Sequence, residues 1–336
     1  MKHYLVILNG GAGNTQAITD LEGRIRQGLG EGEGARVLVT RTRDAAEARR
    51  TARSAARSGR FDALVVAGGD GSLHQIVDGL SNSDLPLGLI PMGTANDLAS
   101  RYEIPKHGVE EACAIIRAGQ TTRLDLVRVA DDEREEDKAF ATGGGFGVVA
   151  RVALGVQHAR ERSAAFRWLL RRVGAWIYPI VTLFTLLFAR RLHQRYEVET
   201  ADGRRRELEG YAALLMNLPS LGAHFQAAPR ASERDGLLDV VLLERTGGIF
   251  SRLRFMACVA HIARGTHLGR ADVHHFRARS LRVTAPGAAC IADGELIAQG
   301  SRFDVEVDRK ALTLLVPAAF AERAESVFAS RDSRAA

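Results

Sequence analysis

The first third of the chain alternates short apolar runs with glycine-rich or polar segments and helical patterns. The apolar runs cover residues 4–8, 35–39, 61–67 and 87–90. Uninterrupted runs of this length are typical of strands that are buried on both faces of a parallel sheet. A helix is predicted over 44–58, and its narrow apolar stripe consists of Ala45, Ala48, Ala52 and Ala55. This order of elements predicts a doubly wound α/β domain.

From residue 196 onward the pattern changes to shorter strands that are separated by turn signals. The predicted strands are 196–200, 211–216, 238–243, 280–284, 290–292, 302–307 and 312–316. Ala-Asp-Gly at 201–203 and Ala-Pro-Gly at 285–287 are typical of the turns between such strands. Together these features predict an antiparallel β-sandwich. A charged connection over 131–138, expected to be a hairpin or linker, precedes this region.

A glycine-rich segment at 68–72, Gly-Gly-Asp-Gly-Ser, follows the third apolar run and precedes a helical pattern. Such a loop commonly binds phosphate, because glycines let the backbone approach and the helix dipole favours negative charge. Ser72 stands at the expected helix N-cap. The Asp70 carboxylate would repel phosphate unless Mg²⁺ lies between them or the carboxylate accepts a proton from an attacking hydroxyl. The alternative is a plain glycine turn in which Asp70 caps the helix.

A second strand–loop–helix unit follows closely, with Pro-Met-Gly-Thr-Ala-Asn-Asp at 91–97 after the fourth apolar run. Loops after the strands of a doubly wound sheet lie at its carboxyl edge. The loops after residues 8, 39, 67 and 90 are therefore expected to meet there. No P-loop Gly-Lys-Ser/Thr occurs, and no Gly-x-Gly-x-x-Gly follows the first strand, so ordinary P-loop and Rossmann proteins are disfavoured.

Composition narrows the class of protein. With 336 residues, 46% of them hydrophobic, the chain can form the cores of two domains. A net charge of +6, carried mainly by arginine, suits phosphate ligands, nucleic acid or an anionic membrane surface. The arginines are spread and not interleaved with aromatic residues, which disfavours nucleic acid. The cysteines, Cys113, Cys258 and Cys290, show no metal-binding spacing and fit a reducing cytosol. No signal peptide is visible, so a cytoplasmic location is expected.

Four motifs together resemble a known family. They are GGDGS followed by HQIVDGL, PMGTAND, DGLLDV at 235–240, and Ala-Asp-Gly-Glu at 292–295. They resemble the diacylglycerol kinase catalytic family, in particular the soluble bacterial lipid kinases related to sphingosine kinases. GGDG is shared with the NAD kinases, whereas GTAND is more specific. The resemblance implies an ATP-binding domain over 1–129 with a C-terminal return at about 315–336, a lipid-substrate β-sandwich over 130–314, and an active site in the cleft between them.

The resemblance also implies roles for individual residues. Expected nucleotide contacts are Asn9, Thr40, Gly68, Gly69, Gly71, Ser72, Gly93, Thr94, Asn96 and Asp97. The proposed general base on the lipid hydroxyl is Glu295, although Asp70 is a candidate for the same role. Asp70, Asp97 and Asp125 are expected to orient the Mg²⁺ that binds with the nucleotide. Asp235 would help to bind a structural divalent ion, and Asp239 would support that region.

Simpler interpretations remain open at these positions. Asp125 could be a surface acid on a half-exposed strand, and Asp-Gly at 235–236 and 293–294 is also a common hairpin turn. The chain departs from the family pattern at Gly10, which replaces a proline, and at His74 and Gln75, which replace asparagine and glutamate. The loss of the carboxylate at Gln75 removes one local charge near the proposed metal. A glycine-rich turn of the family is expected at 143–147, facing the cleft.

An apolar segment over 173–189 contains no charged residue. Its aromatic and basic flanks are Trp168, Trp176, Tyr178, Arg167, Arg171, Arg172, Arg190 and Arg191. This outline resembles a membrane span, but the segment is slightly short and contains Pro179. The alternative, which we favour, is a helix that packs on the sandwich and offers aromatic and arginine side chains to a bilayer surface. In the family this region lines the lipid entrance.

Taken together, the residues and the resemblance predict an ATP- and Mg²⁺-dependent kinase that phosphorylates a lipid hydroxyl, with diacylglycerol as the expected acceptor and a place in phospholipid biosynthesis. Ceramide-like, sphingoid and polyprenol acceptors are not separated by the sequence. The predicted partners are ATP and a lipid at an anionic membrane surface, with peripheral association, and a homodimer is left open. Two alternatives are a kinase of NAD or another soluble alcohol, and a non-catalytic lipid- or nucleotide-binding protein.

Overall fold

The computed structural model describes the chain except for residues 10–14, 94, 134–136, 190–191, 223–224, 249 and 322–336. It divides into two compact units. Unit 1 comprises Met1–Leu124 together with the segment from Lys310, and unit 2 comprises Asp125–Arg309. Unit 2 is therefore inserted within the sequence of unit 1, and two strands, β5 (Thr121–Asp131) and β13 (Glu295–Leu315), contribute residues to both.

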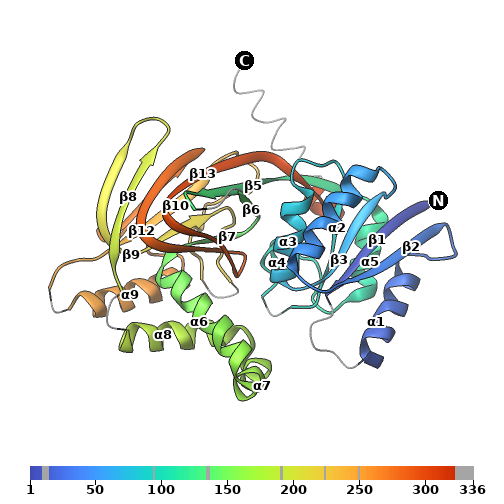
Figure 1. Cartoon of the computed structure of the whole chain (residues 1–336), viewed down its shortest axis with the longest axis horizontal. Coiled ribbons are helices and arrows are strands. Elements are labelled where there is room, and N and C mark those ends of the chain that lie inside the picture. The colour runs from blue at the N-terminus through green and yellow to red at the C-terminus, as the bar shows by residue number, and fades with distance from the viewer. Residues whose placement is uncertain are drawn as a thin grey trace. The chain divides into compact units, whose positions relative to one another are not determined.

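Unit 1 is an α/β domain with a parallel sheet (Figure 1). Its further elements are β1 (Lys2–Asn9), α1 (Thr15–Gly28), β2 (Ala35–Thr42), α2 (Ala45–Ser58), β3 (Ala63–Gly68), α3 (Asp70–Leu80), β4 (Leu87–Pro91), α4 (Asp97–Arg101) and α5 (Val109–Ala118). The strand order is β2-β1-β3-β4, and all neighbours are parallel. The end of β13 pairs with β4 through Leu314 and Leu87, also in parallel. The predicted α/β class is confirmed.

Helices α2 and α3 approach each other closely because their contact is made of small residues. Ala48, Ala52 and Ala55 are buried on α2. A Cβ atom on Gly79 of α3 would lie 2.7 Å from the Arg49 carbonyl oxygen and 2.8 Å from the Ala52 Cβ. Glycine is therefore required at this contact. Three residues of the predicted alanine stripe are buried, whereas the fourth, Ala45 at the start of α2, is exposed.

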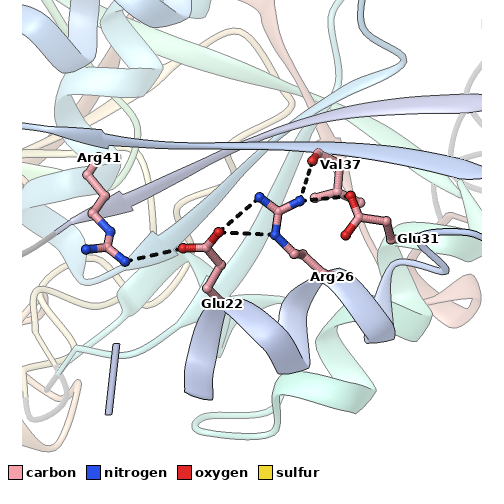
Figure 2. A network of polar contacts seen from close by, with 5 residues as sticks. All are labelled: Glu22, Arg26, Glu31, Val37 and Arg41. Carbon is pink, nitrogen blue, oxygen red and sulfur yellow. Dashed lines mark hydrogen bonds and ion pairs between the residues drawn. The ribbon is translucent and has the colours of Figure 1, made fainter. Parts of the chain in front are cut away.

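A polar network fixes α1 to β2 (Figure 2). The Arg26 guanidinium donates to the Glu22 carboxylate at 2.9 Å, to Glu31 at 2.8 Å and to the Val37 carbonyl oxygen at 2.8 Å. Glu22 also accepts from Arg41 at 3.3 Å. The side chains are only partly exposed, so the planar guanidinium with several partners holds the helix end more firmly than a single surface pair would.

Unit 2 is an antiparallel β-structure with helices on one side (Figure 1). Its elements are β6 (Lys138–Phe140), β7 (Gly143–Gly147), α6 (Val148–Arg162), α7 (Ala164–Val173), the 3₁₀ helix η1 (Gly174–Trp176), α8 (Ile177–Phe188), β8 (Gln194–Thr200), β9 (Arg205–Met216), β10 (Leu238–Glu244), α9 (Ser251–Ala263), β11 (Val273–Ala278) and β12 (Ser280–Ala292). Neighbouring strands follow the order β11-β10-β9-β7-β12-β13, with β8 beside β9 and β12, and β5 beside β13 and β6.

Two hydrophobic clusters stabilise unit 2. One lies among the strands and includes Phe146 and Phe303, whose rings are 4.7 Å apart. The other joins the strands to α6, α8 and α9 and includes Tyr211 stacked on Phe255 at 4.1 Å. The sandwich-like second domain is confirmed. Strands expected separately at 280–284 and 290–292 are one strand, β12, whose pairing register shifts between Thr284 and Ala288. Those expected at 302–307 and 312–316 belong to β13.

The glycine-rich segment at 143–147 is a strand, β7, and not the turn that was expected. It pairs with β9 on one side and with β12 on the other. A Cβ atom on Gly144 would lie 1.9 Å from the Ile291 carbonyl oxygen, and one on Gly145 would lie 2.1 Å from that of Ala213. The glycines are therefore explained by the close approach of three strands.

The apolar segment 173–189 forms the end of α7, then η1 and α8. Ile177 and Leu186 are buried, and α8 packs on α6, so the segment covers the sheet as one of the two interpretations predicts. Across the residues that the structure describes, no helix has the length and apolar character needed to cross a membrane. Arg190 and Arg191 lie outside the described residues.

Candidate active site

The two glycine loops of unit 1 meet at Asp70. Its carboxylate accepts the backbone N–H of Asn96 on Oδ2 at 2.8 Å and that of Asp97 on Oδ1 at 3.0 Å. These two N–H groups stand at the first turn of α4, where a helix has no internal acceptors for them. Asp70 therefore caps a helix, as the simpler interpretation expected of it, but the helix is α4 and not its own. The contact also brings two predicted site acids, Asp70 and Asp97, next to each other.

Glycines allow the two loops to touch through their backbones. A Cβ atom on Gly93 would lie 2.5 Å from the Gly69 Cα and 2.8 Å from Asn96 Oδ1. The Asn96 side chain accepts from the Gly93 N–H at 3.1 Å and donates to the Gly93 carbonyl oxygen at 2.6 Å, while its own backbone is left-handed with φ 52°. The Met92 N–H donates to the Gly68 carbonyl oxygen at 2.8 Å. The loops after residues 67 and 90 thus meet as expected, whereas the same expectation for the loops after residues 8 and 39 stays a prediction.

The other expected nucleotide contacts lie along the same strands. Gly68 ends β3, and Asn9 ends β1. Thr40 pairs with Ile7, but β2 continues to Thr42, so Thr40 does not end its strand as expected. Thr94 and the loop 10–14 lie outside the described residues.

Helix α3 begins earlier than the sequence suggested. Its first residue is Asp70 and its N-cap is Gly69, which forms no side-chain cap. Ser72 therefore stands inside the first turn, beside Gly71, and it is buried instead of acting as the N-cap. The physical reason is that Asp70 can adopt helical geometry while its carboxylate bonds to the neighbouring loop.

Asp125, the first residue of unit 2, is buried, so its interpretation as a surface acid is wrong. Its carboxylate accepts the Gly236 N–H at 2.6 Å, and its own N–H donates to the Glu233 carbonyl oxygen at 2.7 Å. Gly236 has φ 76°, and a Cβ atom there would lie 2.6 Å from Arg309 Nε. The loop before β10 thus requires glycine and is held against Asp125.

A buried polar cluster fixes the turn that carries Glu295. Asp293 and Gly294 have φ values of 50° and 81°, as in a type I′ hairpin turn, and Glu295 pairs with Ala292. The Asp293 carboxylate accepts the N–H of Ala141 at 3.1 Å, the N–H of Thr142 at 3.0 Å and the Thr142 hydroxyl at 2.5 Å. The turn is therefore fixed to the segment before β7.

Asn217 extends this cluster to Asp125. It is 1% exposed, and its amide donates to the carbonyl oxygens of Asp125 at 2.9 Å and Ala141 at 2.7 Å. Its backbone N–H donates to the Thr142 carbonyl oxygen at 3.0 Å. Sequence reasoning missed Asn217 and Thr142, which carry no motif. The available signal was a polar residue directly after the apolar run of β9.

The DGLLDV segment forms ion pairs across strands. Asp235 is paired with Arg277, and Asp239 Oδ1 contacts His275 Nε2 at 2.6 Å. Burial raises the pKa of the Asp239 carboxyl, and the hydrogen bond to His275 opposes that rise. Arg277 Nε also lies 3.7 Å from Asp239 Oδ2. Ion pairs across strands therefore explain both acids of this motif, which a hairpin turn alone would not.

The acids that the structure describes fit one of the two expected metals. Within the described residues, no three His, Cys, Asp or Glu side chains gather as a metal cage made by the protein alone. Mg²⁺ that binds with a nucleotide needs only one or two carboxylates, because phosphate oxygens and water complete its shell. Asp70 and Asp97 fit that donor set. Asp235 does not fit a structural divalent ion, because a guanidinium already bonds to its carboxylate.

Comparison with known proteins places this geometry in a family. Residues 3–129 match the diacylglycerol kinase catalytic domain, and residues 150–316 match the YegS C-terminal NAD kinase beta sandwich-like domain. A diacylglycerol kinase of Mycobacterium tuberculosis is 31% identical over 252 residues, which are 75% of this chain and 76% of that protein. The chain belongs to the diacylglycerol kinase family of lipid kinases. The expected family and the expected class of enzyme, a kinase, are confirmed.

Further relatives of this lipid kinase agree. The diacylglycerol kinase of Bacillus subtilis is 26% identical over 227 residues, covering 66% of this chain and 67% of that protein. A crystal structure of a diacylglycerol kinase from Bacillus anthracis superimposes with a TM-score of 0.65 at 18% identity, covering 95% of this chain and 98% of that chain. At that identity the structure supports the fold alone.

Proposed function

We propose that this lipid kinase transfers the γ-phosphoryl group of ATP to the hydroxyl of a membrane lipid, with diacylglycerol as the acceptor and phosphatidic acid as the product. In this reaction the lipid oxygen forms a bond to the γ-phosphorus, the bond to the β,γ-bridging oxygen breaks, and the hydroxyl proton passes to a carboxylate. The observation that carries the proposal is the joining of the two glycine loops by the Asp70 carboxylate in a chain of this family.

The two loops suit a nucleotide because glycines without side chains stand where their backbones meet. Gly69 and Gly93 have no side chain between the loops, and the first loop precedes the N-terminus of α3, where phosphate is favoured. Mg²⁺ held with Asp70 and Asp97 would supply charge neutralisation for the phosphates. In the proposed site Asp70 fixes the spacing of the two loops, and Asp97, whose backbone N–H bonds to Asp70, would supply the second carboxylate.

We assign the acceptance of the lipid proton to Glu295, with Asp70 as the competing candidate. Both oxygens of Asp70 already accept backbone N–H groups, and protonation of this carboxylate would weaken the two hydrogen bonds that join the loops. Glu295 follows a turn that three hydrogen bonds to Asp293 hold in place. A fixed backbone with a longer side chain suits a group that must reach an acceptor.

The alternatives are less well supported. GGDG alone would also suit a kinase of NAD or another soluble alcohol, but GTAND, DGLLDV and the exposed apolar helix face favour a lipid acceptor. A non-catalytic binding protein would not require both Asp70 and Asp97, and only Gln75 in place of the usual glutamate points in that direction.

The surface of α7, η1 and α8 supports peripheral binding to an anionic membrane. Its large side chains are exposed although the segment is apolar, with Trp168 at 59%, Trp176 at 61%, Phe184 at 63% and Phe188 at 67%. Arg172 lies 5.2 Å from the Trp168 ring centroid, so a cation accompanies the aromatic side chain. Exposed aromatic groups beside arginine suit the interface of an anionic bilayer. We therefore propose that the kinase binds lipid from the cytoplasmic surface.

Helix α9 extends the same surface, which the sequence did not suggest. Phe250 and Leu253, at its start, are 61% and 60% exposed. Arg252 donates to the carbonyl oxygens of Ala189 at 2.6 Å and Leu187 at 3.4 Å and so fastens α9 to the end of α8. A second copy of the chain is the other occupant that would cover this face. Sedimentation of the protein without lipid tests that homodimer.

The test is phosphoryl transfer from labelled ATP to a panel of diacylglycerol, ceramide, a sphingoid base, a polyprenol and NAD. We expect transfer to diacylglycerol and a loss of roughly a hundredfold or more in the Asp70→Asn variant, because the carboxylate that would bind Mg²⁺ and that joins the loops is removed. Asp84→Asn, an exposed acid of unit 1 that pairs with Arg123, serves as the matched control and should keep full turnover. Near wild-type turnover of Asp70→Asn, or transfer to NAD alone, would refute the proposal.

A further inference from the structure

The acidic motif before and within β10 brings together carboxylates that need a cation. Asp235 is half-buried and Asp239 is buried. Two carboxylates this close in sequence and removed from water repel each other unless a positive charge stands with them. The family resemblance assigns that charge, at Asp235, to a structural divalent ion.

The structure gives this position to a side chain. Arg277 lies on β11 directly opposite Asp239 on β10. Its Nη2 bonds to Asp235 Oδ2, and its Nε lies 3.7 Å from Asp239 Oδ2. One guanidinium therefore faces both acids from the neighbouring strand, in a position that the strand register fixes.

The remaining oxygens of the two acids are also engaged. Asp235 Oδ1 accepts the Leu237 N–H at 3.1 Å, and Asp239 Oδ1 contacts His275 Nε2 at 2.6 Å. Asp239 Oδ2 is buried without a hydrogen bond to any described residue, so the nearby Arg277 is the cation that compensates it. Each carboxylate oxygen of Asp235 therefore already has a hydrogen-bond donor, so neither is fully available to bind an ion.

A divalent ion and this guanidinium would compete for the same oxygens. Mg²⁺ and Ca²⁺ bind oxygen ligands at about 2.0–2.6 Å. The permanent positive charge of Arg277, which is paired with Asp235, would repel these ions. Guanidinium remains charged at every relevant pH and offers several donors in one plane. We infer that Arg277 is the built-in cation of the DGLLDV motif, and that this segment of the chain folds and holds its place without a divalent ion.

The consequence extends beyond the ion pair. Between Asp235 and Leu237, the Gly236 N–H donates to the Asp125 carboxylate at 2.6 Å. Arg277 thus secures the loop that contacts Asp125 by means of a charge that chelators cannot remove. The inference concerns the fold of unit 2 and does not depend on which lipid or nucleotide the enzyme uses.

The experiment is thermal unfolding of the full chain without nucleotide, followed by circular dichroism in excess EDTA and in millimolar Mg²⁺ or Ca²⁺. We expect the wild-type Tm to be the same in all three, whereas an ion present far above its Kd would raise Tm by several degrees. A rise that is abolished in Asp235→Asn would overturn the inference. A rise that persists in Asp235→Asn comes from other acids and supports it.

A second measurement tests the arginine itself. Arg277→Gln should lower Tm more than Arg282→Gln, the matched control, because Arg282 forms one exposed strand-to-strand pair, with Asp304, on the same structure. Equal Tm values for the two variants would contradict the role of Arg277. If Arg277→Gln fails to fold while Arg282→Gln folds, the comparison supports that role, and the wild-type response to EDTA still decides whether an ion is present.

Discussion

Replacing Asp293 by asparagine tests whether the buried carboxylate, and not merely the shape of the hairpin turn, fixes the start of β13. The wild-type carboxylate accepts three hydrogen bonds, from the Ala141 N–H and from the N–H and hydroxyl of Thr142. It is 5% exposed, so water cannot replace these donors. Asparagine keeps the size of the side chain and removes one acceptor together with the charge.

The magnitude follows from these contacts. The asparagine oxygen can keep the two bonds to Thr142, which places its amide hydrogens against the Ala141 N–H. The Ala141 N–H loses its acceptor, and the asparagine amide becomes a second buried donor without a partner, each with a cost of about 1–3 kcal/mol. The two retained bonds also weaken, because neutral pairs are roughly half as strong as charge-assisted ones. We expect a total loss of about 3–5 kcal/mol from the free energy of unfolding.

Urea denaturation followed by far-UV circular dichroism measures this loss. The control is Asp202→Asn, because Asp202 also lies in a hairpin turn and bonds a threonine hydroxyl, Thr200, and an arginine, Arg204, but is exposed to solvent. The control should leave the denaturation midpoint nearly unchanged. A loss below about 1 kcal/mol in Asp293→Asn, the range of an exposed polar contact, would refute the reasoning.

Three further predictions concern chemistry, membrane contact and pH. Glu295→Gln should lower phosphoryl transfer to lipid by about 10²–10⁴-fold and leave the ATP affinity, measured by calorimetry, unchanged. A large loss of ATP affinity would contradict the assignment of Glu295 to the lipid hydroxyl. Vesicle binding should require anionic lipid, fall with salt and weaken further in Trp168→Ala/Trp176→Ala; retention through carbonate washing would contradict peripheral binding. Burial raises the pKa of the Asp272 carboxyl, but the hydrogen bonds from Arg270 outweigh burial and leave this pKa below its usual value. The Asp272 carboxylate therefore stabilises the fold above about pH 4, and this contribution is lost at lower pH. In urea denaturation, Asp272→Asn should lower the free energy of unfolding at about pH 7 and change it little at about pH 3. An equal loss at both pH values would refute the role of the Asp272 charge.

The fold class was predictable because its signals are local and repeated. Apolar runs followed by glycine loops identify parallel strands, and Asp44 caps α2 by accepting the Glu47 N–H at 2.8 Å, so that helix begins where the sequence indicates. The glycines of β7 were misjudged because glycine marks turns and close strand contacts alike. Only the neighbouring carbonyl groups of Ile291 and Ala213 decide between them, and they are distant in sequence.

The candidate site was predictable where motifs carry it and not where packing does. The two glycine loops follow consecutive parallel strands, so their meeting at Asp70 follows from topology. Asn217 could not be identified, because one polar residue after an apolar strand gives no periodic signal. Its partners, the carbonyl groups of Asp125 and Ala141, are 92 and 76 residues away. Arg277 could not be assigned for the same reason, since its partner Asp235 is 42 residues away.

The return of the chain to unit 1 has a consequence for the order of biosynthesis. Leu314 pairs with β4 on the side away from β3, and the Val316 N–H donates to the Gln120 carbonyl oxygen at 2.9 Å, so residues that are made after unit 2 complete the first unit. Unit 2 is continuous in sequence and can fold as it leaves the ribosome, whereas the N-terminal sheet waits with an unpaired edge. A ribosome stalled before Leu314 would therefore hold a nascent chain whose catalytic loops are already made but whose sheet is still open to pairing with another chain.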